Sequence, residues 1–273
     1  MLYSFFFKSL CLLALLPIST LFAQDEYHNF KLAFEFGMNE AGCKLAEHKR
    51  LRKDNYPYNK FSLFGTRSYS LVTTYFSLKP EFFVFNNRIG IASGFRYTTA
   101  TSELVSDNDI YSFLWKVQEE GYNTQYVRLN SLRQKSHLMG IPFEIRSFLN
   151  NRELPFQTYI KIGVSFNYCI SSESHVNFTN KAMERHKNTV KSQLSKNDNA
   201  FSSFAFAAIG FKIGKFKEER NTPWANIEFQ FPYILLTNKS FAFVGRGVDI
   251  IPGGGFQLSF QIPIGKNVPI GSK

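Results

Sequence analysis

The chain has 273 residues, a formal net charge of +11, and an aromatic content of 17% that includes 31 Phe and 13 Tyr. No basic helix, zinc-finger spacing or RNA-binding strand motif accompanies the positive charge, which argues against a nucleic-acid partner. The mean hydropathy of −0.19 does not exclude a membrane protein, because strands that carry apolar residues on only one face have a low average hydropathy.

The first segment predicts export. Lys8 precedes an apolar run from Leu10 to Leu16, Pro17 follows it, and Ala23 supplies the small residue expected at a cleavage site. This pattern is typical of a secretory signal peptide over residues 1–23. The run is shorter than the ~20 apolar residues of a membrane-spanning helix, and no later run reaches that length. If the mature chain enters a membrane, it does so as strands.

Most of the remaining chain alternates apolar and polar residues. In 224–235, Ile227 and Phe229 are on one face, and Glu228 and Gln230 are on the other; segments 160–170 and 256–264 repeat the pattern. A period of two is that of a β-strand, and an uninterrupted apolar face suits contact with lipid. The alternation predicts eight strands, at residues 30–38, 71–85, 88–98, 137–149, 156–170, 201–213, 224–237 and 254–264.

The predicted connections differ in length at the two ends of these strands. Those after the first, third, fifth and seventh strands are long, and those between them are short. This asymmetry is typical of outer-membrane barrels, which have short periplasmic turns and long extracellular loops. Asn86-Asn87, Asn150-Asn151 and Asn221-Thr222-Pro223 supply turn-forming residues for the short connections. The sequence therefore predicts an all-β fold, an eight-stranded antiparallel up-and-down transmembrane β-barrel, as one domain over residues 24–273 with both ends in the periplasm.

Charged residues fall on the strand face opposite the apolar one. They would point into the lumen, which in an eight-stranded barrel is narrow enough for side chains to fill. Because an unpaired buried charge is costly, Glu35, Glu144 and Glu228 are each expected beside Arg or Lys. We interpret the set as a structural ionic core rather than an ion-selective ring or a proton path. Its predicted members are Lys31, Glu35, Arg88, Arg96, Glu144, Arg146, Lys161 and Glu228.

Two of the long connections are rich in Lys and Arg. The first contains Lys49, Arg50, Arg52 and Lys53, which are candidate contacts for the phosphorylated glycolipid of the outer leaflet. The alternative is that these charges only keep the loop tips soluble. The basic residues of the third long connection are Lys181, Arg185, Lys187, Lys191 and Lys196.

Metal binding and disulfide formation receive little support from the sequence. Cys43 and Cys169 remain after signal cleavage, and an oxidising periplasm permits a bridge between them, which sequence alone leaves open. The five histidines are scattered without the spacing of metal ligands. No metal or cofactor is expected.

A lipid hydrolase at the barrel rim is an alternative that the sequence raises. The predicted outer ends of two strands contain Ser and His next to acidic or amide residues, the residue types of a hydrolytic triad. However, Ser136 and Ser174 each adjoin a histidine and so point away from it in a strand. His-x-Ser, the spacing expected of known barrel lipases, does not occur, so no enzyme is expected. The residues in question are Ser136, His137, Glu173, Ser174, His175 and Asn177.

Three segments resemble those of a known family. They are FKLAFEFGMN at 30–39, LMGIPFEIR at 138–146 and YIKIG at 159–163. They are similar to the opening strand, the strand with an Ile-Pro pair and the following Gly-bearing strand of the PorT-like outer-membrane β-barrels of Bacteroidota. The resemblance implies an eight-stranded barrel in the outer membrane, and for some family members a role with the type IX secretion apparatus. One departure is that residues 266–273 follow the final strand without the terminal aromatic residue typical of barrel assembly signals.

Together these patterns predict a non-enzymatic outer-membrane barrel with a role in envelope structure or as an accessory to secretion. Its expected partners are outer-membrane lipids and envelope or secretion-system proteins. A secreted, soluble, calycin-like barrel that binds an apolar ligand is the first alternative, because eight strands also form that fold. In that case the charges would face outward and the aromatic residues inward.

Overall fold

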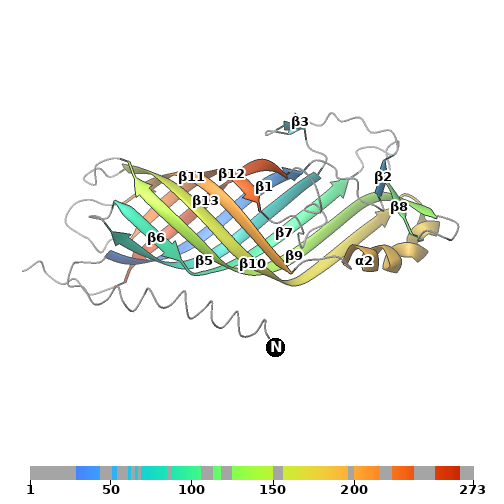
Figure 1. The fold of residues 1–273 in the computed structure, drawn as a ribbon, viewed down its shortest axis with the longest axis horizontal. Helices are drawn as coiled ribbons and strands as arrows, with labels where there is room; N and C mark the ends of the chain where they lie inside the picture. The colour runs from blue at the N-terminus through green and yellow to red at the C-terminus, as the bar shows by residue number, and fades with distance from the viewer. Residues whose placement is uncertain are drawn as a thin grey trace, which may run out of the picture.

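The computed structural model describes residues 29–43, 51–53, 61–62, 65–66, 69–84, 88–105, 113–117, 125–149, 156–195, 200–214, 223–236 and 250–264. Most of these residues form long, tilted β-strands around a common axis (Figure 1). Within the described ranges, no helix is long and apolar enough to cross a membrane. The predicted signal peptide and the three Asn-containing turns lie outside the described residues.

The main sheet is antiparallel and closes on itself. Following the pairing from β1, each strand hydrogen-bonds to the next until β13 returns to β1. β6 and β7 follow one another along the chain on either side of Gly94, and both pair with β5 and with β9. The ring consists of β1 (Asn29–Cys43), β5 (Tyr69–Val84), β6 (Ile89–Ser93), β7 (Phe95–Val105), β9 (Tyr126–Phe148), β10 (Phe156–Phe178), β11 (Phe201–Ile213), β12 (Trp224–Leu235) and β13 (Ile250–Pro263).

The two ends of the barrel differ. At one end, which we call the turn end, the strands are joined by the short connections 85–88, 149–155 and 214–223. The opposite end carries the small elements, and we call it the capped end (Figure 1). There, β2 pairs with β8 and β8 pairs with β9, while β3 and β4 form a separate hairpin. The small elements are β2 (Leu51–Lys53), β3 (Phe61–Ser62), β4 (Gly65–Thr66), β8 (Phe113–Lys116), the 3₁₀ helix η1 (Lys181–His186) and α2 (Lys187–Ser195).

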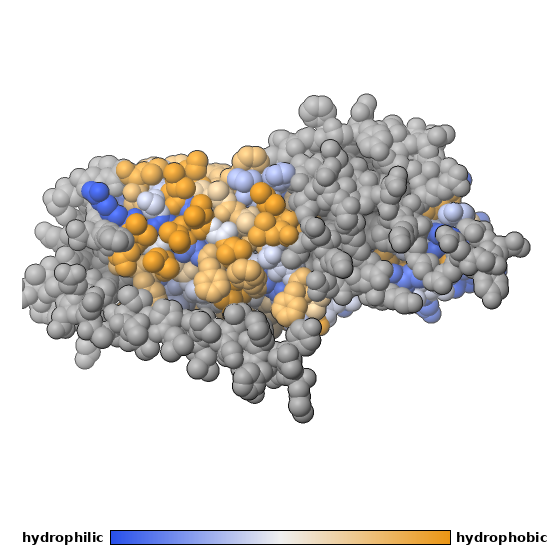
Figure 2. All heavy atoms as spheres, viewed as in Figure 1, coloured by the Kyte–Doolittle hydropathy of each residue, from blue (hydrophilic) through white to orange (hydrophobic). Residues whose placement is uncertain are grey.

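The outer surface of the barrel wall is apolar. Along β13 and just beyond it, every second residue from Phe256 to Ile264 is an exposed apolar side chain, and Phe260 is 61% exposed. These eight residue steps span about 20 Å at a strand tilt of about 40°, close to the ~25 Å apolar band of an outer-membrane barrel. Figure 2 shows apolar side chains gathered over the wall on the side of the turn end, with hydrophilic atoms again at the end that carries α2.

The polarity of the two strand faces inverts along β9. Toward the turn end, Phe143 is exposed on the outside and Glu144 is buried inside. Toward the capped end, Leu138 and Leu132 are buried inside, whereas Lys135 is exposed on the outside. Over the apolar band, the barrel therefore has a polar lumen and an apolar outer surface. Beyond the band, toward the capped end, it has an apolar interior and a polar outer surface.

This inversion explains where the strands differ from the predicted limits. β7 continues to Val105, β9 begins at Tyr126 and β10 continues to Phe178. The predicted loops 99–136 and 171–200 therefore contain strand, and the second also contains η1 and α2. The predicted strand limits rested on the run of outward apolar residues. That run ends where the strands extend beyond the apolar band.

Glycines on the inner face make room for aromatic rings. Gly37 lies opposite Tyr75 on the neighbouring strand, and Gly210 lies opposite Tyr159. A Cβ atom at either glycine would overlap the facing phenol ring. The narrow barrel thus fits two large rings into its lumen by pairing each with a residue that has no side chain.

Candidate functional site: the charged lumen and the capped end

The centre of the lumen is an ion-paired cluster around two carboxylates. Glu35 on β1 is 2.6 Å from Lys79 Nζ and 3.5 Å from Arg96 Nη2. Glu144 on β9 lies 2.7 Å from Arg96 Nη2 and 3.0 Å from Lys161 Nζ, and it also pairs with Lys79. All five side chains are buried. Five different strands of the ring therefore meet at one electrostatic centre.

A second group of contacts extends this cluster toward the turn end. Glu228 on β12 accepts a hydrogen bond from Arg146 Nη2 at 3.2 Å and from the Tyr159 hydroxyl at 2.6 Å, and it pairs with Lys161. Arg146 Nε is also 3.4 Å from Glu81 Oε1. Because Lys161 contacts both Glu144 and Glu228, the two groups form one continuous network.

The alternation in the sequence predicted most of this network, but the predicted set lacked two members on β5. Lys79 and Glu81 are fully buried in the lumen, although neither was in the predicted set. Their signal was present, because they alternate with the outward-facing Phe76 and Leu78. The structure does not place Arg88 in the network, because Arg88 lies in the turn before β6 with an exposed side chain.

Near the turn end, an indole ring stacks with two ammonium groups. Lys31 Nζ lies 3.0 Å from the centroid of the Trp224 ring, and Lys212 Nζ lies 3.3 Å from it. Trp224 also meets Phe83 edge-on, with ring centroids 5.7 Å apart. Lys31, a predicted lumen residue, is therefore buried in an aromatic layer next to the ion-paired cluster.

On the other side of the ionic cluster, the lumen contains a layer of neutral hydrogen bonds. The Tyr75 hydroxyl donates to Gln257 Oε1 at 2.6 Å, and Gln230 Nε2 donates to the same oxygen at 2.9 Å. Asn39 Nδ2 in turn donates to Gln230 Oε1 at 2.7 Å. These side chains cross-link β1, β5, β12 and β13 through the interior.

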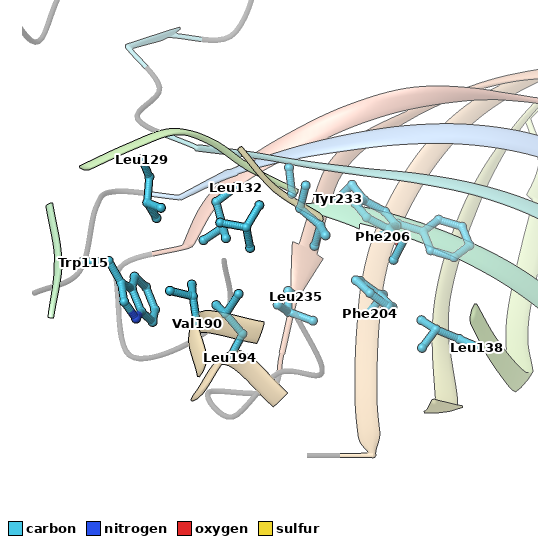
Figure 3. Close-up of a cluster of buried hydrophobic side chains, with 14 of the residues drawn as sticks. Trp115, Leu129, Leu132, Leu138, Val190, Leu194, Phe204, Phe206, Tyr233 and Leu235 are labelled. Carbon is cyan, nitrogen blue, oxygen red and sulfur yellow. The ribbon is translucent and has the colours of Figure 1, made fainter. Parts of the chain in front are cut away.

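Beyond this layer, the interior becomes apolar and α2 closes over it (Figure 3). Val190 and Leu194 of α2 are fully buried in the same cluster as Trp115 of β8. The Trp115 indole donates a hydrogen bond to Gln193 Oε1 at 2.9 Å, and Gln193 Nε2 donates to the Val117 carbonyl at 2.9 Å. Further members of the cluster are Leu71, Leu129, Leu132, Leu138, Val176, Phe204, Phe206, Tyr233 and Leu235.

This layered lumen suits a structural role. Its polar part contains four carboxylates, and every one of them contacts at least one Lys or Arg. These buried ion pairs connect the strands to one another across the lumen. The four are Glu35, Glu81, Glu144 and Glu228.

The residues considered for lipid hydrolysis do not come together. The Ser136 hydroxyl is buried on the inner side and lies 3.1 Å from Ser172 Oγ, whereas His137 Nδ1 hydrogen-bonds the Tyr97 hydroxyl at 2.5 Å on the outside. His175 Nε2 is exposed and lies 4.0 Å from Glu173 Oε2. These contacts do not join a serine to a histidine.

The remaining candidates are described only in part. Cys169 has a free thiol, which contacts the Ser171 carbonyl at 3.4 Å, while the side chain of Cys43 lies outside the described residues. Lys49 and Arg50 also lie outside them, and for Arg52 and Lys53 only the backbone pairing of β2 with β8 is described. Among the described residues, no group of three or more His, Cys, Asp or Glu could hold a metal ion.

Comparison with known proteins adds two distant structural likenesses. One is the crystal structure of the outer membrane protein OprG from Pseudomonas aeruginosa, with 8% sequence identity, coverage of 87% of this chain and 95% of that chain, and a TM-score of 0.30. The other is a deltaS2 mutant of the TodX monoaromatic hydrocarbon channel, with 7% identity, coverage of 89% and 91%, and a TM-score of 0.19. No family model and no curated protein matches the chain. At these TM-scores, the likenesses define neither a family nor a function.

Proposed function

We propose that this protein is a non-enzymatic outer-membrane protein, an eight-stranded transmembrane barrel whose lumen is closed by its own side chains. In this proposal, β6 and β7 form a single strand of the wall that is interrupted at Gly94. The capped end faces outward, and the turn end faces the periplasm. The physiological role is in envelope structure or, as the PorT-like resemblance implies, as an accessory to secretion.

The observation that carries this proposal is the pairing of an exposed apolar band with a buried ionic lumen. Phe229 and Phe260 are 59% and 61% exposed on the outside of the wall, whereas Glu228, which adjoins Phe229 in β12, is fully buried. A contiguous apolar surface of this size would favour association in water. In a bilayer the same surface is solvated by lipid, and closure of the ring pairs the backbone of each wall strand with a neighbour on both sides.

The soluble calycin-like alternative requires the opposite arrangement. It needs apolar side chains inside and polar side chains outside over the whole barrel. The capped end has that arrangement, with Leu132 inside and Lys135 outside, but the part with Phe143 outside and Glu144 inside does not. We therefore retain the outer-membrane assignment and treat the apolar interior of the capped end as the core of a projecting collar.

The experiment that tests the proposal is fractionation of cells that express the tagged full chain, including the predicted signal peptide at 1–23. We expect recovery in the outer membrane, a heat-dependent shift in gel mobility, and cleavage by external protease within residues 106–125 or 179–200. Recovery as a soluble periplasmic protein without a mobility shift would contradict the proposal and favour the calycin-like alternative. Lipid hydrolysis by the purified protein that is lost when His137 or His175 is substituted would contradict the non-enzymatic assignment.

A further inference from the structure

Basic side chains are concentrated at the tip of the capped end. Arg128, Lys181, Arg185 and Lys187 are exposed, Lys191 is partly exposed, and we call these five residues the basic cap. Glu184 is the only carboxylate within η1 and α2. In the part of the chain that the structure describes, none of the five cations is within ion-pair distance of a carboxylate.

The basic cap is held in place by the apolar interior. α2 buries Val190 and Leu194, and Lys187 and Lys191, each three residues before one of them, flank that buried face, with Lys187 exposed and Lys191 partly exposed. η1 is fixed by its own contacts, because Asn180 Oδ1 caps its first turn by accepting from Ala182 N at 2.9 Å.

β9, the strand that carries Arg128, also contacts η1. The Arg128 amide meets Met183 Sδ at 3.2 Å, and the Thr179 amide donates to the Arg128 carbonyl at 3.3 Å. The basic side chains therefore project from a preorganised surface.

The height of the basic cap limits what it can bind. Arg128 lies eleven residues along β9 from Met139, where the apolar band ends on that strand, which places Arg128 about 25–30 Å beyond the band. This distance exceeds the Debye length of ~8–10 Å at physiological salt, so the attraction between the basic cap and phosphates at the surface of the bilayer is screened. On β9, the basic residue close to the surface of the bilayer is Lys135, about 10 Å beyond the apolar band.

The composition of the surface favours a glycan over a protein. From residue 171 to 195, all of which the structure describes, no large hydrophobic side chain is exposed. Protein interfaces depend on buried apolar or aromatic anchors at their centre, and η1 and α2 offer none; on β9, Tyr126, two residues from Arg128, is 39% exposed. A flexible polyanion needs only an array of Lys and Arg that face solvent.

We propose that the basic cap binds the anionic sugar chains, phosphorylated or carboxylated, of glycolipids in the same membrane. This inference rests on the proposed outer-membrane orientation. It assigns glycolipid contact to η1 and α2 rather than to the predicted cluster at 49–53. The sugar chains of neighbouring glycolipids would surround the collar at the height of the cap.

The test compares two variants that each remove four positive charges. The first is K181Q/R185Q/K187Q/K191Q in the basic cap, and the matched control is K49Q/R50Q/R52Q/K53Q. Each is refolded as the full mature chain in uncharged detergent micelles, and heat-shifted gel mobility shows that the barrel has formed. The probe is lipopolysaccharide with a phosphorylated core oligosaccharide, and its Kd is measured by titration.

We expect the cap variant to bind at least about tenfold more weakly and the control variant to bind like the wild type. Wild-type affinity should fall as salt rises from about 50 to about 200 mM, and removal of the core phosphates from the probe should weaken binding. Unchanged binding by the cap variant, or loss of binding only in the control variant, would overturn the assignment. So would equal binding of lipid A that lacks the sugar chain, or stronger binding of an acidic peptide.

Two provisions keep the outcome interpretable. If the quadruple variant does not refold, the charge-reversal variant K187E/K191E, which leaves the buried face of α2 intact, replaces it. Fractionation is scored separately, so a protein that resides in the outer membrane and does not bind the probe refutes the glycan inference alone.

Discussion

Glu144 provides the sharpest test of the lumen network. Its carboxylate contacts Arg96 Nη2 at 2.7 Å and Lys161 Nζ at 3.0 Å, and it also pairs with Lys79. The substitution Glu144→Gln keeps the shape of the side chain and removes its charge. Three buried cations then share Glu35 and Glu228 as their remaining carboxylate partners.

We expect Glu144→Gln to lower the free energy of unfolding by about 3–5 kcal/mol, the usual effect of removing one partner from a buried ion pair. Folded domains are stable by only about 5–15 kcal/mol, so this loss is a large fraction of the total. The measurement is equilibrium unfolding in urea of the protein refolded into lipid vesicles, followed by tryptophan fluorescence.

Two further variants separate charge pairing from a general effect of mutation. Glu173→Gln removes a carboxylate that is 67% exposed, and it should leave the unfolding free energy unchanged. Glu144→Gln/Lys161→Gln removes one charge of each sign, so the double variant should be more stable than the sum of the single effects predicts. Stability of Glu144→Gln equal to that of the wild type would refute the reasoning that the lumen charges must be balanced.

Three other predictions address the wall, the packing of the lumen and the cap. Phe229→Arg places a charge on the exposed apolar band and should lower the free energy of unfolding in vesicles by about 2–4 kcal/mol, whereas Thr189→Arg on the exposed side of α2 should not. Equal effects of the two substitutions would argue against lipid contact. Gly210→Val drives a side chain into the Tyr159 ring and should destabilise the barrel by about 1–3 kcal/mol in the same urea assay, and an unchanged midpoint would show that the ring has room to move. Leu194→Ala leaves a cavity where α2 packs and should lower the stability of this packing by about 2–5 kcal/mol. Protease should then cleave faster within residues 179–200, while the barrel keeps its heat-dependent gel mobility. Cleavage at the wild-type rate would contradict the role of α2 as a packed cap.

Within the apolar band, the alternation of residue types was enough to predict which face of each strand points outward. Alternation has a period of two in both the chain and the strand, so Phe229 and Glu228 must face opposite sides of any sheet that contains them. The same rule located Glu35, Arg96, Glu144, Arg146, Lys161 and Glu228, and it also applied to Lys79 and Glu81, which were overlooked.

Which of these charges meet depends on how the strands are arranged in the closed ring. Glu35, Lys79 and Glu144 come from β1, β5 and β9, and their contact depends on the closure and stagger of the ring, which no local pattern encodes. The capped end was likewise not predicted from the alternation, because the outward face of a single strand changes from apolar to polar along β9. The same alternation then places Leu132 inside and Lys135 outside, and the helix that covers the resulting apolar interior was predicted only as part of a loop.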